Sequence, residues 1–469
     1  NTAIGYSASL NNINGDYNVA CGMMALYSNL DSYNTATGYQ ALYSNTTGSQ
    51  NTANGFRALY LNTTGSENTA TGYQTLYTNT TGAYNTAYGM QALVANTTGL
   101  FNTASGMSAL YSNTNGERNT ATGYGALYTN STGDFNTATG MQALNASTGD
   151  SNTAHGYRAM YTTTTGHSNT ANGYLALNSN TTGIRNIAVG FESLFSNTTG
   201  NYNTATGYNA LHANTNGDFN TAHGFYALNN NTTGINNCGF GSYANYSNSA
   251  GSNIVALGYK SLYNNTGHGN VATGFEALNK NTTGAYNTGT GYRALYNCTT
   301  GLNNAALGIW GLYNITTGSG NIGIGGRTSA NVNSPIVTLT SHNDRIAMGS
   351  AAVTHAYVKV AWTVVSDARD KMNFAPVPYG LDFVNKLKPT AYQFKVDRDT
   401  ETPNGPVLYG FKAQDILALE GDNPVIIDNE DADHLKYKGE HLVPVLVNAV
   451  QELTAMVKEL QTEIKTLKG

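Results

Sequence analysis

Few side chains that could act as nucleophiles, acids, bases or metal ligands occur in the first 330 residues of this 469-residue chain. The cysteines lie far apart, and we interpret them as small space-filling residues rather than a disulfide frame or a metal site: Cys21, Cys238 and Cys298. The histidines lack the spacing of metal ligands. The acidic residues never recur as the facing pair that glycoside hydrolysis needs. The sequence therefore predicts no catalytic set, cofactor or metal in this region.

These residues belong to a 17-residue repeat, which reads NTATGYQALYSNTTGSQ in residues 34–50. Units begin about every 17 residues from Asn1 to Asn321, and one of these starts is placed at Asn253. A fixed period this short is typical of a solenoid with one coil per unit. With strands stacked about 4.8 Å apart, the units would form a rod roughly 90 Å long.

Charged side chains mark the solvent-facing positions of the unit, numbered 1 to 17, because an unpaired charge is rarely buried. Position 7 holds several of them, including Arg57, Arg158 and Glu276, while position 9 is usually Leu. If positions 6 to 11 formed a strand, the leucine would share a face with these charges. A helical turn separates them and puts positions 6, 9 and 10 on the inner side.

We therefore predict a β-rich repeat solenoid in which each coil contains a short parallel strand at positions 1 to 4 and one helical turn. The glycine at position 5 permits the turn between them, and NTTG closes the coil. The alternative is a two-stranded coil like that of trimeric bacterial adhesin head repeats, which NIAVG at 186–190 resembles. The asparagine at position 1 should stack on its neighbours, with side-chain amides bonding along the column.

Two surfaces of the coil leave alternatives open. The strand face at positions 2 and 4 varies too much at position 4 to be a core, so it is either exposed or packed against polar partners in an oligomer. Its Thr-Ala-Thr segments suggest an ice-binding array, but Asn, Tyr and His interrupt them. The Tyr and Phe residues at position 6 could stack on sugars, although such a column is more often core.

The repeat stops after Arg327, and the composition changes there. The first 330 residues contain 17 charged residues and the last 139 contain 32. We predict four parts: a solenoid rod over 1–330, a β-rich neck over 331–365, a further domain over 366–440 and a C-terminal coiled-coil helix over 441–469. The neck is expected from the alternating segments PIVTLT, RIAMG and AYVKVAW.

Residues 366–371 read SDARDK, and GLDFVNKLKPTAYQF (380–394), YGFKAQDI (409–416) and a long helix follow. This order resembles the C-terminal intramolecular chaperone of phage tail fibres and endosialidase tailspikes. Phe374 stands where that family more often has Ile. The resemblance implies an α+β chaperone domain that forms a trimer, assembles the fibre ahead of it and then cuts itself off.

The resemblance also implies which residues cut. Ser366 would be the nucleophile and Lys371 its base, in a Ser-Lys endopeptidase that acts once on its own chain, with Asp367 and Arg369 as supporting residues. A serine needs a base to become a nucleophile, and a lysine amine partly removed from water loses its proton more readily. Taken without the family motif, the Ser-Asp pair would merely cap the following segment.

The terminal helix gives separate evidence of oligomerisation. Its apolar residues alternate in steps of four and three, an unbroken heptad seam: Leu446, Val450, Leu453, Val457, Leu460, Ile464 and Leu467. Val and Ile at position a with Leu at d usually favour two strands. Ala449 and Met456 widen the apolar face, which suits three strands, and the family resemblance implies three. We therefore predict a trimeric coiled coil.

These features predict an extracellular trimeric fibre for receptor binding or adhesion, on a phage tail, an injection system or a bacterial surface appendage. Its partners would be two further copies of the chain and a cell-surface glycan or protein receptor. An attachment partner is expected at the N-terminus, because the chain begins with a repeat unit and without Met. The alternative function is a tailspike-type polysaccharide depolymerase.

Other classes of partner are disfavoured by composition. A net charge of −5 gives no basic footprint for nucleic acid. No apolar run approaches the roughly 20 residues of a membrane span. The acidic run at 428–433 lacks the glycine and spacing of a calcium loop, and we interpret it as a solvated loop.

Overall fold

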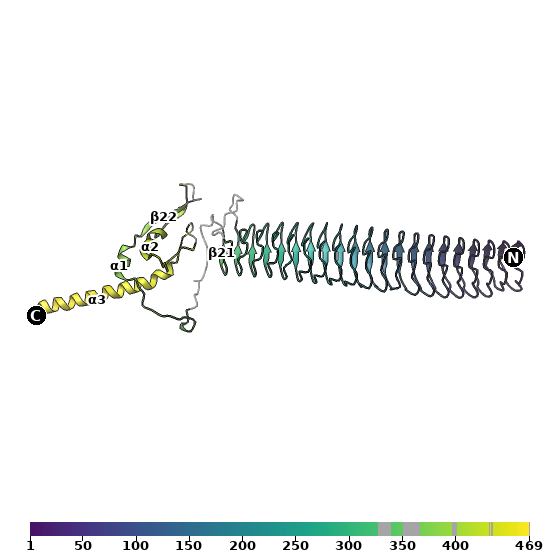
Figure 1. Cartoon of the computed structure of the whole chain (residues 1–469), viewed down its shortest axis with the longest axis horizontal. Coiled ribbons are helices and arrows are strands. Elements are labelled where there is room, and N and C mark those ends of the chain that lie inside the picture. The colour runs from purple at the N-terminus through teal and green to yellow at the C-terminus, as the bar shows by residue number, and fades with distance from the viewer. Residues whose placement is uncertain (327–338, 350–365, 396–400, 431, 433–434, 469) are drawn as a thin grey trace. The chain divides into compact units, whose positions relative to one another are not determined.

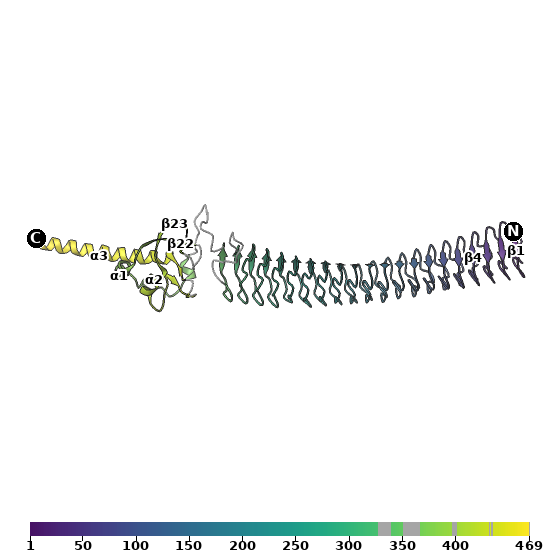
Figure 2. The ribbon, with the colours of Figure 1, turned by 90° about the horizontal axis from the view of Figure 1, so that it is seen from above.

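The computed structural model describes the whole chain except residues 327–338, 350–365, 396–400, 431, 433–434 and 469. The chain divides into two compact units, Asn1–Met348 and Gly349–Gly469. The first unit is a parallel β-solenoid, which Figure 1 shows as a row of similar coils with the strands in a single line. Figure 2 shows the same row from above.

Each coil contributes one three-residue strand, which pairs in parallel with the strand of the next coil. The register follows the repeat, so Thr52 is paired with Thr35 and with Thr69. The predicted parallel solenoid with 17-residue coils is confirmed. The strands are β1 (Thr2–Ile4), β2 (Val19–Cys21), β3 (Thr35–Thr37), β4 (Thr52–Asn54), β5 (Thr69–Thr71), β6 (Thr86–Tyr88), β7 (Thr103–Ser105), β8 (Thr120–Thr122), β9 (Thr137–Thr139), β10 (Thr153–His155), β11 (Thr170–Asn172), β12 (Ile187–Val189), β13 (Thr204–Thr206), β14 (Thr221–His223), β15 (Cys238–Phe240), β16 (Val255–Leu257), β17 (Val271–Thr273), β18 (Thr288–Thr290), β19 (Ala305–Leu307), β20 (Ile322–Ile324) and β21 (Ile346–Met348).

The turn after each strand differs in detail from a turn of α-helix. In the coil 51–67, Arg57 and Leu59 have φ values of 54° and 52°, in the left-handed region. Their N–H groups donate to neighbouring coils, to the carbonyls of Tyr39 at 2.9 Å and Thr75 at 3.0 Å. A helical turn would direct these N–H groups into its own segment. The left-handed backbone, although costly for L-residues, keeps the hydrogen bonds that join one coil to the next.

This backbone decides which side chains face the core. Ala58 and Leu59, at positions 8 and 9, are fully buried, whereas Phe56 at position 6 is exposed. A helical turn would have put positions 6, 9 and 10 on the inner side. The aromatic residues of position 6 therefore form an outer column, and the expectation that they belong to a core is wrong.

Two columns of buried asparagines join the coils. At position 1, the Oδ1 of Asn34 accepts the N–H of Asn51 at 3.0 Å, and the Nδ2 of Asn51 donates to the carbonyl of Gly65 at 2.8 Å. This confirms the stacking predicted for position 1. At position 12, the Nδ2 of Asn62 donates to the Oδ1 of Asn45 at 2.7 Å, a second column that the sequence analysis missed. Buried amides paired in this way hold neighbouring coils in register.

The rod departs from the prediction in the start of one coil and in the position of its C-terminal boundary. Ile254, and not Asn253, occupies position 1 of its coil, because its N–H donates to the Oδ1 of Asn237 at 3.1 Å and β16 follows it. Ile346–Met348, which was expected in the neck, forms β21 and pairs with β20. The solenoid therefore includes a strand beyond residue 330. The other predicted neck segments lie wholly or mostly outside the described residues.

The second unit is a small α+β region that ends in a long helix, as predicted. β22 pairs with β23, and β24 with β25, both antiparallel. The core of this region is formed by Phe383, Ile416, Ile426, Ile427, Leu442 and Val445. Its elements are η1 (Ala368–Asp370), α1 (Leu381–Lys386), β22 (Thr390–Lys395), β23 (Pro403–Gly410), α2 (Ala413–Glu420), β24 (Ile427–Asp428), β25 (Lys436–Tyr437), η2 (Gly439–His441) and α3 (Leu442–Lys468).

Two carboxylates tie the segments of this region together. Glu420, at the end of α2, is buried, and its oxygens accept three backbone N–H groups at 2.7 to 2.9 Å from Val425, Ile426 and Ile427. Glu452 on α3 accepts the N–H of Leu381, the first residue of α1, at 2.7 Å. Hydrogen bonds to charged groups are stronger than hydrogen bonds between neutral groups. The bonds to Glu420 therefore hold the loop after α2, and the bond to Glu452 holds the start of α1.

Candidate functional site

The segment from Ser366 to Lys371 contains one turn of 3-10 helix, η1. Asp367 caps this turn, since its carboxylate accepts the N–H of Arg369 at 2.8 Å. The guanidinium of Arg369 also contacts this carboxylate at 2.5 Å, and it lowers the pKa of Asp367 below its ordinary value. An ion pair in contact with water contributes little stability, so its main effect is to hold the shape of the turn.

The turn brings the side chains of Ser366 and Lys371 together. The Nζ of Lys371 lies 2.6 Å from the Oγ of Ser366, within the range at which a base can take a hydroxyl proton. Both side chains are exposed to solvent in the single chain. The structure thus places together the two residues that the sequence analysis paired, with Asp367 and Arg369 between them on the same turn.

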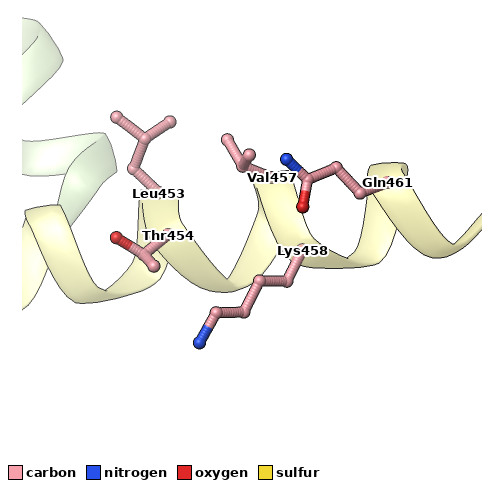
Figure 3. Close-up of a pocket in the computed structure, with 5 residues that line it drawn as sticks. All are labelled: Leu453, Thr454, Val457, Lys458 and Gln461. Carbon is pink, nitrogen blue, oxygen red and sulfur yellow. The ribbon is translucent and has the colours of Figure 1, made fainter.

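The terminal helix α3 presents an apolar face along most of its length. The seven residues of the predicted heptad seam, from Leu446 to Leu467, are between 41% and 86% exposed. Figure 3 shows Leu453 and Val457 on one side of α3 and Lys458 on the other. A contiguous apolar face of this kind marks an interaction surface. The described residues of the single chain leave this one open to a partner.

Aromatic rings stack in columns along the rod, and the columns of positions 6 and 10 lie on the outer side of its turns. Rings of position 6 stack with centroids 5.0 to 5.3 Å apart through Tyr157, Tyr174, Phe191, Tyr208 and Phe225. Rings of position 10 stack at 5.0 to 5.3 Å through Tyr27, Tyr43, Tyr60 and Tyr77. The sequence analysis missed the column at position 10, because a helical turn would have directed it inward.

Charged side chains of position 7 lie between these two columns. The guanidinium carbon of Arg57 is 5.3 Å from the ring centroid of Phe56 and 5.2 Å from that of Tyr60. Arg293 pairs with Glu276 of the preceding coil at 2.7 Å, which raises the pKa of Arg293. The charges predicted at position 7 are therefore only partly exposed, because aromatic rings flank their stems.

The strand face and the cysteines of the rod lie apart from the aromatic columns in sequence position. Positions 2 and 4 of the strand face lie outside the core, as Thr52 and Asn54 illustrate. Cys21 is exposed, Cys298 is buried, and neither forms a disulfide. Among the described residues, no cluster of three or more His, Cys, Asp or Glu could hold a metal ion. No helix in that part of the chain is long and apolar enough to cross a membrane.

Comparison with known proteins identifies the C-terminal region. Residues 366–423 match the family described as chaperone of endosialidase. The matched segment runs from Ser366 to just beyond α2 and includes Lys371. Neither a curated protein nor a solved structure matches the chain. The predicted resemblance is confirmed for this region, and a chaperone of this family behind a solenoid rod fits a phage fibre-type protein.

Proposed function

We propose that this chain is one subunit of a trimeric fibre that binds a cell-surface receptor, and that residues 366–440 form a chaperone domain that cuts itself off beside Ser366. The observation that carries the proposal is the 2.6 Å contact between the Nζ of Lys371 and the Oγ of Ser366. This contact lies at the start of the segment that matches the endosialidase chaperone family.

The proposed cleavage uses Ser366 as nucleophile and Lys371 as base. The Oγ of Ser366 gives its proton to the Nζ of Lys371 and attacks the carbonyl carbon of the adjacent peptide bond. The C–N bond breaks, and the leaving nitrogen takes the proton from Lys371. Water then hydrolyses the ester that remains and releases the serine hydroxyl. Asp367 and Arg369 would hold the turn that keeps the two reacting side chains together.

The exposure of this pair explains why cleavage would wait for assembly. A lysine amine acts as a base when water around it is reduced, and in the single chain both Ser366 and Lys371 are exposed. We assign the removal of water to the other two chains of the trimer. The apolar seam of α3, which we include in a coiled coil over 441–469, supplies the contact that brings the chains together.

The rod explains why a chaperone would be needed. Most coils present the same small residue at position 3, and Asn at positions 1 and 12, so a slip by one whole coil keeps most contacts between coils. A stack with many near-equivalent registers has competing arrangements of similar energy. A trimer formed first at the C-terminal end would align three rods before the chaperone is released.

The same family match supports a setting for this fibre. We place it outside the cell, on a phage tail, on an injection system or on a bacterial surface appendage. Its receptor would be a cell-surface glycan or protein that contacts the outer columns of the rod. These columns are long, regular and rich in tyrosine, a residue favoured in binding surfaces.

Self-cleavage is tested by expressing the full chain and Ser366→Ala side by side. The wild type should give a shorter main band that lacks the C-terminal region, and the variant should run at full length. A mass measurement of both proteins then locates the cut and reports whether three chains associate. If both proteins run at full length, the proposed use of Ser366 fails.

The depolymerase alternative is tested separately. The purified rod is incubated with polysaccharides from candidate hosts, and the products are sized by chromatography. We expect intact polymers, because the rod's acidic residues do not recur as a facing pair. Release of oligosaccharides would show that the rod cleaves polysaccharides, and the depolymerase alternative would then replace adhesion as the proposed function.

A further inference from the structure

The outer column of position 6, in which methionines replace rings at several coils, has a break at residues 237–253, where its large side chain is missing. Five rings stack from Tyr157 to Phe225, and stacking resumes from Tyr259 through Phe275 to Tyr292 at 5.2 Å. Ser242 stands between these two stacks. From Tyr6 to Ile309, every other member of the column is Tyr, Phe, Met or Ile. The serine is therefore the only small side chain in this stretch of the column.

The break changes which parts of the aromatic rings lie next to one another. Inside a stack, each ring face is covered by the next ring, so only ring edges remain for a ligand. At Ser242 the rings of Phe225 and Tyr259 have no neighbour of the same column between them. Sugar rings bind proteins through aromatic faces and through hydrogen bonds to tyrosine hydroxyls. At the break the ring of Tyr243, from position 7, lies 5.4 Å from that of Phe225 and is turned by 78° from it.

The tyrosines of position 7 beside the break have an unusual orientation. The rings of Tyr226 and Tyr243 are parallel within 5°, with centroids 5.6 Å apart. They are turned by 83° and 78° from the ring of Phe225. Both tyrosines are half-buried. Two parallel rings that cross the direction of the main stack form a local aromatic platform.

A cation lies next to this platform. The Nζ of Lys260 is 5.9 Å from the ring centroid of Tyr243, 5.3 Å from that of Tyr259 and 5.4 Å from that of Tyr263. In the described part of the chain, no carboxylate forms an ion pair with Lys260. Its interaction with the Tyr259 hydroxyl raises the pKa of Lys260, and the carboxylate of Glu276 in the next coil adds to this shift. An anionic group would complement this position.

The core under the same coil also departs from the repeat. Asn245 occupies position 9, where Leu is usual, and it is fully buried. Neither amide atom of Asn245 has a hydrogen-bond partner among the described residues, which costs about 1–3 kcal/mol. Gly239 replaces the alanine of position 3. Natural proteins often tolerate such a loss of stability at functional sites. The unpartnered Asn245 is therefore consistent with a function at the surface of this coil.

We propose that the surface around Ser242 is a binding site for a carboxylated sugar of a surface glycan. The sugar ring would lie against the aromatic rings of Tyr243 and its neighbours, and its carboxylate would pair with Lys260. This inference rests on the proposed receptor-binding function and assigns it to one coil of the rod.

The test uses the full chain on a printed panel of glycans that carry carboxylated sugars, together with their neutral counterparts. The wild type should bind carboxylated members more strongly than neutral ones. Ser242→Tyr restores the ring that the other coils have, and Lys260→Met removes the charge but keeps the apolar stem. Each variant should weaken binding by about tenfold or more, the loss expected for one charge-assisted contact.

Two matched variants control for general effects on the rod. Met141→Tyr adds a ring to position 6 at another coil. Lys280→Met removes a lysine that lies over Tyr296 alone and is bonded to Asn297. Both should bind as the wild type does. The oligomeric state of all proteins is measured by light scattering, because a loss of trimer in Ser242→Tyr would assign the surface to a contact between chains.

The outcomes separate this inference from the proposed function. If the wild type binds glycans and all variants bind equally well, the site lies elsewhere on the rod and the inference fails, while adhesion stands. If the wild type binds only neutral glycans, the role given to Lys260 is wrong. If it binds none, both this site and a glycan receptor are refuted, and the self-cleavage assay on Ser366 is unaffected.

Discussion

The Nζ of Lys371 lies 2.6 Å from the Oγ of Ser366, across one turn of 3-10 helix that Asp367 caps. The spacing of five residues and the capped turn together bring the two atoms into contact. The same pair is exposed to solvent in the single chain. The contact between Ser366 and Lys371 is therefore present in the single chain. We propose that assembly would add to it by removing water from around the two side chains.

Replacing Lys371 by arginine separates charge from basicity. Arginine keeps the positive charge and the reach to Ser366, but it cannot give up its proton in a protein. We expect Lys371→Arg to fold, to assemble and to remain uncut when the products are separated by gel electrophoresis. Lys386→Arg is the control, because Lys386 forms an exposed ion pair with Asp382 on α1, and this change should leave cleavage unchanged. Cleavage of Lys371→Arg at the wild-type rate would exclude Lys371 as the base.

The asparagine column of position 12 should carry much of the rod's stability. Asn62 donates to Asn45 at 2.7 Å and to Gly65 at 2.9 Å, and it accepts from Asn79 at 2.7 Å. Asn62→Ala leaves buried groups without partners, which should cost about 2–3 kcal/mol. Hydrogen exchange on the full chain should show the loss in the adjoining coils first, since each coil contacts only its neighbours.

The control for this change is Thr64→Ala in the same coil, because Thr64 is exposed. It should leave exchange rates unchanged within error. Equal protection from hydrogen exchange in Asn62→Ala and Thr64→Ala would contradict this prediction. It would mean that the asparagine column of position 12 adds no stability beyond what packing supplies.

The sequence predicted the coil but not the path of its backbone. The strand positions and the stacking of the asparagines at position 1 followed from the small residues and from the period. The turn did not follow, because leucine at position 9 gives no sign of a left-handed backbone, which L-residues avoid. Its φ of about 50° is imposed by hydrogen bonds to the neighbouring coils, as for Leu59. Such long-range contacts cannot be read from one repeat unit.

The glycines of position 5 should tolerate no side chain. Gly55 has a φ of +142°, and a Cβ there would lie 2.3 Å from the carbonyl oxygen of Gly72 in the next coil. Gly55→Ala must therefore push two coils apart, at a cost of at least about 2 kcal/mol. The measurement is the urea midpoint of the full chain.

The matched change is Gly125→Gln at position 7. Gly125 has a φ of +60°, and a Cβ there would have its nearest contact at 3.7 Å. The next coil already has Gln142 at this position with a φ of 57°. The cost should be about 1 kcal/mol or less. A midpoint for Gly55→Ala equal to that of Gly125→Gln would contradict the proposed close approach between coils.

The buried thiol of Cys298 should make stability depend on alkaline pH. Burial raises the pKa of Cys298 from 9.0 to about 11. Below pH 9 the thiol is neutral in both states and its contribution is complete. As the pH rises from 9 towards 11, the unfolded state ionises first, so the folded state loses stability.

This effect is isolated by comparison with Cys298→Ser, because Ser147 occupies the same position in another coil. The difference in urea midpoint between the wild type and Cys298→Ser should shift in favour of the variant between pH 9 and 11. A thiol reagent at pH 8 should modify the exposed Cys21 and spare Cys298 until the rod unfolds. Rapid modification of Cys298 in the folded protein would show that its coil opens readily.

A catalytic role for Ser366 and Lys371 could be predicted only through the family motif, and their surroundings in the structure are consistent with this. Ser366 and Lys371 are exposed residues without the buried partners that usually mark an active site. The aromatic platform near Ser242 could not be predicted either, since it depends on ring orientations at Tyr226 and Tyr243. The orientation of these two rings is a relation between neighbouring coils, which one repeat unit does not contain.

Assembly and cleavage should fail together when the seam of α3 is disrupted. Leu453 is 48% exposed in the single chain and lies at a d position of the heptad pattern. Leu453→Asp would place three carboxylates at the axis of the proposed trimer, where like charges repel. We expect monomers by light scattering and an uncut chain on gels. Lys458→Asp, on the other side of the helix in Figure 3, should still assemble and cleave. A Leu453→Asp protein that stays monomeric but cleaves normally would show that the pair of Ser366 and Lys371 works without the trimer, and would overturn the link between assembly and release.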